Sequence, residues 1–189
     1  MSEQSERLAR GEWYLDDEEL QDRRRRCWRL LDSYNATGAD DDAERARLLT
    51  TMLGSVGDGV VVMPRFQCSY GSNIDLGEGV FVNRGGFLMD DAPIHLGAHT
   101  RVGPGAQLMT ALHPVDDHQR RREGWERALP ITIGENVWLG ANVVVGAGVS
   151  IGDDTVVGAG SVVLEDLPGR VVAAGAPARV VRSTAPGGA

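Results

Sequence analysis

The chain has 189 residues, enough for one domain with a small appendage, and carries a formal net charge of −8 with 42% apolar and 5% aromatic residues. This balance is not an electrostatic match for nucleic acid, and no stretch approaches the ~20 apolar residues of a membrane span. The N-terminus lacks the apolar core of a signal peptide, and two cysteines make neither a disulfide framework nor a metal cluster, so the sequence favours a cytoplasmic protein.

Residues 1–56 are expected to form a small helical segment. Apolar side chains recur at helical spacing between positions 16 and 34, and a second helix is expected after the acidic cluster 40–42. The apolar residues that carry this pattern are Cys27, Leu30, Leu31 and Tyr34 in the first helix, and Leu48, Leu49, Met52 and Leu53 in the second.

A run of four arginines, residues 23–26, is the one basic feature of this segment. Acidic residues precede it, and the pairs Glu19–Arg23 and Asp22–Arg26 have the favourable i,i+4 orientation on a helix. We therefore interpret the run as a solvated helix face rather than a binding patch for an anionic partner.

A six-residue repeat dominates residues 57–182. The chain has 25 glycines, about twice the share expected from an average usage of roughly 7%. Many of them follow an aliphatic residue at a spacing of six. The clearest run is Ile133, Leu139, Val145, Ile151, Val157 and Val163, with earlier runs at Leu76, Val82 and Leu88 and at Leu96, Val102 and Leu108. The two earlier runs are offset by two residues around Ala92-Pro93.

A period of six fits neither an α-helix nor a meander of hairpins. It fits a triangular coil in which each hexad supplies one short strand and one corner, with the aliphatic side chain pointing inward. Three hexads then make one coil, so residues 18 positions apart stack: Ile133 on Ile151, Leu139 on Val157 and Val145 on Val163. The sequence predicts an all-β solenoid, a parallel β-helix, with a narrow aliphatic core.

The rhythm is interrupted over residues 114–130, which are polar and are predicted to form a long loop thrown out of the coil. Residues 183–189 are expected to be a frayed tail. His113 stands where the loop opens. An imidazole there could accept a proton from a hydroxyl that attacks a thioester, although a merely exposed histidine fits the residues equally well.

The ordered motifs resemble those of the maltose, galactoside and nodulation-factor (nodulation protein L-like) O-acetyltransferases over nearly the full chain. These motifs are Gly11-Glu12-Trp13-Tyr14, Ser69-Tyr70-Gly71-Ser72-Asn73-Ile74, Asp90-Asp91, His113-Pro114, Val137-Trp138-Leu139-Gly140, Gly158-Ala159-Gly160-Ser161 and Gly175-Ala176-Pro177-Ala178-Arg179. The resemblance implies a left-handed parallel β-helix and transfer of an acetyl group from acetyl-coenzyme A, without a metal, to a hydroxyl of a sugar-like acceptor. It also implies a homotrimer with active sites between subunits.

The resemblance assigns roles to individual residues. His113 matches the catalytic base, and Asn83 matches a residue that positions the acceptor or stabilises the oxyanion. The other positions that match acceptor contacts are Asp16, Ser69, Asp91 and, in a looser alignment, Trp125. Asn83 and Asp91 could instead be corner residues that tolerate left-handed backbone.

For coenzyme A, the resemblance implies backbone contacts at Ala141 and Ala159 and charged groups near the nucleotide phosphates at Arg179 and Arg182. Leu164-Glu165 departs from the family, which usually has Thr-Lys there. Glu165 would repel a phosphate placed close by. The two arginines could also be a solvated edge.

Three other functions remain open at this point. The acceptor could be another hydroxyl compound, such as an antibiotic or a secondary metabolite. Carbonic anhydrase-like β-helices bind zinc, and His113 and His118 have the H-x₄-H spacing, but a third ligand is not evident because Gly77 stands near the expected position. A non-catalytic scaffold would be expected to lack the base.

Overall fold

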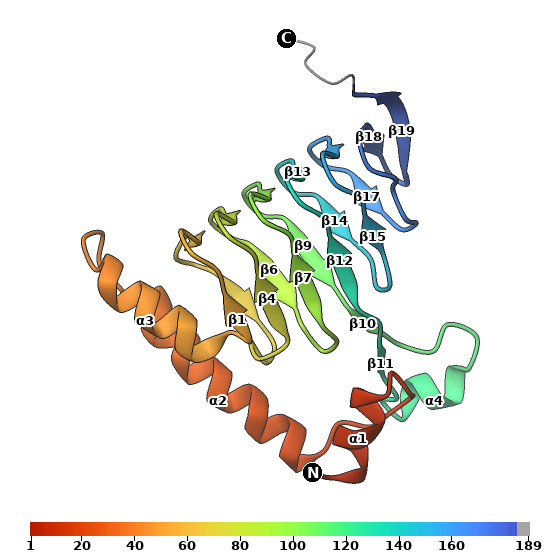
Figure 1. Ribbon diagram of the computed structural model, residues 1–189. Helices are drawn as coiled ribbons and strands as arrows, with labels where there is room; N and C mark the ends of the chain where they lie inside the picture. The colour runs from red at the N-terminus through yellow and green to blue at the C-terminus, as the bar shows by residue number, and fades with distance from the viewer. Residues whose placement is uncertain (185–189) are drawn as a thin grey trace.

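The computed structural model describes residues 1–184 and consists of a group of helices and a prism of short parallel strands (Figure 1). Three helices precede the prism: α1 (Glu3–Ala9), α2 (Glu18–Asn35) and α3 (Asp42–Met52). The two predicted helices are confirmed, and their apolar faces are buried except for Leu30, which is partly buried. The sequence did not predict α1.

Local hydrogen bonds explain where α2 and α3 begin. The Asp17 side chain accepts a hydrogen bond from the Leu20 N–H and caps α2. Asp41 occupies the corresponding position of α3 but makes no side-chain cap, because its carboxylate accepts from the Gly38 N–H at 2.7 Å. The acidic cluster 40–42 therefore marks the start of α3, but the Asp41 side chain does not cap the helix.

The ion pairs predicted for the arginine run, residues 23–26, are wrong. Among the ion pairs of residues 1–184, Asp22 contacts Arg25 at 2.5 Å, and neither Glu19–Arg23 nor Asp22–Arg26 is present. Glu19 instead accepts hydrogen bonds from the first turn of α1. Arg24 turns away from solvent toward Asp16, which brings one member of the run to the prism.

The prism has three faces, and their strands are parallel except for β19 at the C-terminal end. Face 1 contains β1 (Ser55–Val56), β4 (Ile74–Leu76), β7 (Ile94–Leu96), β12 (Ile131–Ile133) and β15 (Ser150–Ile151). Face 2 contains β2 (Val61–Val62), β5 (Phe81–Val82), β8 (Arg101–Val102), β13 (Trp138–Leu139), β16 (Val156–Val157), β18 (Val171–Gly175) and β19 (Ala178–Ser183). Face 3 contains β3 (Gln67–Cys68), β6 (Phe87–Met89), β9 (Gln107–Met109), β14 (Val144–Val145) and β17 (Val162–Val163). Since β1 already pairs with β4, the prism begins at Ser55 rather than at residue 57.

The predicted stacking is confirmed in the later coils, where Ile133 lies on Ile151, Leu139 on Val157 and Val145 on Val163. These side chains are buried and form one aliphatic column, which explains how the chain fills its core with so few aromatic residues.

The earlier coils are two residues longer than predicted. Leu76 stacks on Leu96 and Val82 on Val102, twenty positions apart. The extra residues lie at the corner between face 3 and face 1, in segments 69–73 and 90–93. At the same corner of the following coil, the chain leaves the prism as the long segment 110–130. We call these three segments the widened corner. The offset around Ala92-Pro93 thus marks an enlarged corner rather than a break in the helix.

Segment 114–130 has more structure than the loop that the sequence predicts. It contains α4 (His118–Arg122), capped by Asp117, and β11 (Arg127–Ala128), which pairs antiparallel with β10 (Ala111–Leu112). Its far end attaches to the helical segment, because Glu126 forms a β-bridge with Tyr14 and Arg127 donates to the Gly11 carbonyl at 2.7 Å. Segment 114–130 is therefore attached to the prism through the β10–β11 pair and to the helical segment through Glu126 and Arg127 (Figure 1).

At the C-terminal end of the prism, β18 and β19 form an antiparallel hairpin. The expectation of a frayed tail over residues 183–189 is wrong for its first two residues. Ser183 is the last residue of β19, and the Thr184 N–H donates to the Arg170 carbonyl at 2.8 Å. Residues 185–189 lie outside the described residues. Among the helices of residues 1–184, none is both long and apolar enough to cross a membrane.

Candidate active site

The widened corner borders a cleft of about 400 Å³ between the prism and α2. Three of the residues that the sequence analysis assigned to the site line it: Ser69, Asp91 and His113. Arg24, Trp28 and Glu126 line it as well, and the sequence analysis missed all three. Each segment of the widened corner supplies one of the expected residues, so the same extra length that breaks the 18-residue period builds the cleft.

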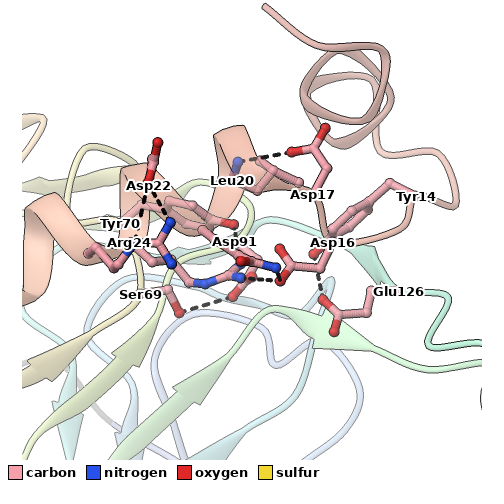
Figure 2. A network of polar contacts seen from close by, with 12 residues as sticks. Tyr14, Asp16, Asp17, Leu20, Asp22, Arg24, Ser69, Tyr70, Asp91 and Glu126 are labelled. Atoms are coloured by element: carbon pink, nitrogen blue, oxygen red, sulfur yellow. Dashed lines mark hydrogen bonds and ion pairs between the residues drawn. The ribbon is translucent and has the colours of Figure 1, made fainter.

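Asp91 and Ser69 form the floor of this cleft. The Ser69 hydroxyl donates to Asp91 Oδ2 at 3.1 Å (Figure 2). Burial raises the pKa of Asp91, the Ser69 hydrogen bond opposes this, and the nearby Glu126 carboxylate adds to it. A carboxylate and a hydroxyl side by side can both donate to and accept from the hydroxyls of a polyol.

Asp16 reaches the cleft only through Arg24. The Arg24 guanidinium donates to Asp16 Oδ2 at 2.5 Å and to the Tyr70 hydroxyl at 2.7 Å. Figure 2 shows this guanidinium between the helical segment and the prism. Asp16 itself is not among the lining residues, so its carboxylate contributes by orienting Arg24.

Glu126 occupies the position expected for Trp125. The β-bridge with Tyr14 turns Glu126 toward the cleft, and the buried Tyr14 hydroxyl donates to Glu126 Oε2 at 2.9 Å (Figure 2). Burial, followed by the charges of Asp91 and Glu126, raises the pKa of Tyr14, so this phenol stays protonated as a donor. The Trp125 side chain does not line the cleft, and its indole N–H donates to Glu123.

The backbone of Trp125 nevertheless contacts His113. The His113 Nδ1 lies 3.1 Å from the Trp125 carbonyl oxygen. A carbonyl oxygen can only accept a hydrogen bond, so Nδ1 carries the proton and donates it. This contact fixes the ring tautomer and leaves a lone pair on Nε2 of a residue that lines the cleft.

Cys68 lines the same cleft but is a poor nucleophile. Its Sγ lies 3.5 Å from Cys27 Sγ, and both thiols are buried. The contact with Cys27 and the burial raise the pKa of Cys68, so its reactive thiolate form is disfavoured.

A second groove of about 540 Å³ runs along face 2 and contains Asn83, Ala141 and Ala159. Trp138 lines it and is 57% exposed, so this tryptophan presents an apolar surface to the groove. The groove passes over closely stacked corners, since a Cβ on Gly140 would lie 2.6 Å from the Ala159 nitrogen. Asn83 therefore lies in a different hollow from His113 in one chain.

Neither Asn83 nor Asp91 has a left-handed backbone. The corner asparagines and aspartates with positive φ are Asn136, Asn142 and Asp154. The alternative explanation of Asn83 and Asp91 as left-handed corner residues is therefore wrong. Asn83 Oδ1 instead accepts a hydrogen bond from the Arg84 N–H at 2.8 Å, and Asp91 accepts one from Ser69.

The residues expected near the coenzyme A nucleotide lie beyond both hollows. Leu164 is exposed after β17, and the exposed Glu165 and Arg179 side chains form an ion pair at 3.6 Å. Arg182 donates to the Ser183 carbonyl. Glu165, which stands where the family usually has lysine, thus partly compensates the charge of Arg179. Within residues 1–184, no group of three His, Cys, Asp or Glu side chains is arranged to hold a metal ion.

Two family models match the chain. The model of the maltose acetyltransferase hexapeptide capping motif matches residues 7–57, and that of the bacterial transferase hexapeptide (six repeats) matches residues 130–165. The chain is 38% identical over 179 residues to the galactoside O-acetyltransferase of Escherichia coli K12, covering 94% of this chain and 88% of the relative.

Solved structures extend the similarity to the whole fold. A maltose O-acetyltransferase from Clostridium difficile 630 has a TM-score of 0.95 at 38% identity and covers 97% of this chain and 98% of its own. A galactoside acetyltransferase in complex with coenzyme A has a TM-score of 0.94 at 37% identity, covering 98% and 92%. Such scores require the same path and handedness, so the predicted left-handed parallel β-helix is confirmed. The chain belongs to the maltose and galactoside O-acetyltransferase family, the hexapeptide-repeat enzymes that transfer acetyl groups from acetyl-coenzyme A.

Proposed function

We propose that this protein transfers an acetyl group from acetyl-coenzyme A to a hydroxyl of a sugar or sugar-like acceptor, with His113 as general base. The observation that carries the proposal is the hydrogen bond from His113 Nδ1 to the Trp125 carbonyl, which leaves Nε2 as the basic atom at the cleft. Nε2 takes the proton of the acceptor hydroxyl while its oxygen attacks the thioester carbonyl. The tetrahedral intermediate then collapses, and the departing coenzyme A thiolate receives the proton from the imidazolium.

The chemistry of the cleft supports an acceptor with several hydroxyls. Ser69, Asp91, Glu126 and Arg24 offer acceptors and donors within one hollow of about 400 Å³. Such a site rejects an analogue that lacks a hydroxyl, because a buried polar group would lose its partner. Relatives named for galactosides and maltose support a sugar. An antibiotic or another secondary metabolite with a similar array of hydroxyls is the alternative acceptor.

The groove on face 2 is the proposed place of the pantetheine arm. Ala141 and Ala159 offer backbone groups along it, and Trp138 offers an apolar surface. A similar fold has been solved with coenzyme A. Arg179 and Arg182 would then lie toward the nucleotide phosphates, and Glu165 would weaken that end of the site by competing for Arg179.

A homotrimer would complete the site. In one chain Asn83 and His113 line different hollows, and face 2 exposes Trp138 and Val61. Packing face 2 of one subunit against the widened corner of the next would bring Asn83 of one chain to His113 of the other, where its amide would help to hold the acceptor or the oxyanion.

The cytoplasm is the proposed location of the protein. It is a reducing compartment, which fits the two unlinked thiols of Cys27 and Cys68, 3.5 Å apart.

The direct test is release of free thiol from acetyl-coenzyme A in the presence of single acceptors. We expect release with a galactoside or maltose and a product mass increased by one acetyl group on oxygen. Release only with a hydroxyl-bearing antibiotic would favour the alternative acceptor. No release with any hydroxyl compound would contradict the proposal.

A further inference from the structure

Asp90 stands next to the cleft residue Asp91 but is itself completely buried. It follows β6 at the widened corner and does not line the cleft. A buried carboxylate is costly unless several hydrogen bonds compensate for lost hydration, so its partners indicate what it does.

All of these partners belong to segment 69–73. Asp90 Oδ1 accepts from the Ser69 and Tyr70 backbone N–H groups, both at 2.8 Å, and Oδ2 accepts from the Asn73 N–H at 3.3 Å. The Asn73 side-chain amide also donates to the Asp90 carbonyl at 2.7 Å. One carboxylate thus holds both ends of the segment.

That segment carries two contacts of the cleft. The Ser69 hydroxyl donates to Asp91, and the Tyr70 hydroxyl accepts from Arg24. We infer that the ionised Asp90 carboxylate is a positioning residue for the acceptor, which keeps the Ser69 hydroxyl on Asp91 and the Tyr70 hydroxyl on Arg24. This inference rests on the proposed acetyl transfer. A protonated acid or an amide would place a donor against backbone N–H donors and leave at least one of them unpaired.

The same geometry gives the site a dependence on pH. Burial raises the pKa of Asp90 to about 6, and the N–H groups of segment 69–73 oppose this shift. The titratable neighbours are Cys68 of β3, Tyr70 and Asp91, none of which is a cation. As pH falls through about 6, Asp90 gains a proton and segment 69–73 loses hydrogen bonds. The acceptor KM then rises, whereas the acetyl-coenzyme A KM stays unchanged.

The experiment measures steady-state kinetics of full-length Asp90→Asn between pH 5 and 8. We expect the acceptor KM at pH 7.5 to rise roughly tenfold or more, in the range of a lost hydrogen bond to a charged group. The acetyl-coenzyme A KM should stay near that of the wild type. The rise of acceptor KM near pH 6 should shrink, and what is left of it at lower pH belongs to Asp91, whose pKa burial also raises. The control is Asp153→Asn, since Asp153, although exposed, also accepts a backbone N–H, from Glu135 at 2.8 Å, and lies outside the cleft.

A double-mutant cycle separates positioning from general destabilisation. If Asp90 acts through Ser69, Asp90→Asn should raise the acceptor KM only about twofold in a Ser69→Ala background. Simple additivity, or an unchanged acceptor KM in folded Asp90→Asn, would overturn the inference. Should Asp90→Asn fail to fold, the pH profile of Ser69→Ala decides: the rise of acceptor KM near pH 6 must shrink relative to the wild type, and an unaltered rise overturns the inference. A wild type that acetylates no hydroxyl refutes the proposed function instead.

Discussion

Mixing two inactive variants tests whether His113 and Asn83 act together across subunits. His113→Ala removes the proposed base, and Asn83→Ala removes the amide in the groove of face 2, each expected to lower turnover by on the order of 10²–10³ or more. In the proposed trimer, assembled at random from equal amounts, a complete site would need an intact His113 in one chain and an intact Asn83 in its neighbour. Each condition holds for half of the chains, so about a quarter of the sites are complete.

The assay is thiol release by trimers co-expressed with two different tags and purified through both. Purification through both tags removes the trimers of a single variant, and every mixed trimer has one complete site among its three, so activity per site should reach about a third of the wild-type value, far above either parent. A matched mixture of wild type with the doubly substituted chain, purified in the same way, discriminates further: the two-chain site predicts about a sixth of the wild-type activity per site, whereas a site within one chain predicts about half. A first mixture no more active than its parents would refute the shared site.

Three further substitutions test the aliphatic core and the proposed nucleotide end of the coenzyme A site. Leu139→Ala removes a buried side chain stacked between Val102 and Val157 and should lower the free energy of unfolding by about 2–5 kcal/mol. The partly buried Val144→Ala serves as its control in chemical denaturation, and an equal loss in both variants would contradict the inward column. Glu165→Lys removes the competitor for Arg179 and should lower the acetyl-coenzyme A KM several-fold without changing the acceptor KM; an unchanged or higher value would show that this end does not meet the phosphates.

The periodic part of the molecule was predictable because each hexad repeats the same local requirement. The column from Ile133 to Val163 follows from spacing alone, and even the widened corner left a trace in the offset around Ala92-Pro93. Ser69, Asp91 and His113 were found through family motifs that sit at this corner.

Two of the three missed residues, Arg24 and Glu126, have partners that lie far along the chain. Arg24 looked like part of a solvated run because its partner Tyr70 is 46 positions away. Glu126 was overlooked in favour of Trp125 because its orientation depends on Tyr14, which is 112 positions away. Spacing within a window of the sequence cannot reveal such pairs, since they form only when the helical segment docks on the prism.

The central claim is that His113 accepts the proton of the acceptor hydroxyl, and it is tested most directly by the single-turnover rate of His113→Ala with saturating acetyl-coenzyme A and acceptor. The claim predicts a rate lowered by on the order of 10²–10⁴, with the Kd for acetyl-coenzyme A and the unfolding temperature unchanged. Acetylation by the variant at a rate near that of the wild type would contradict it.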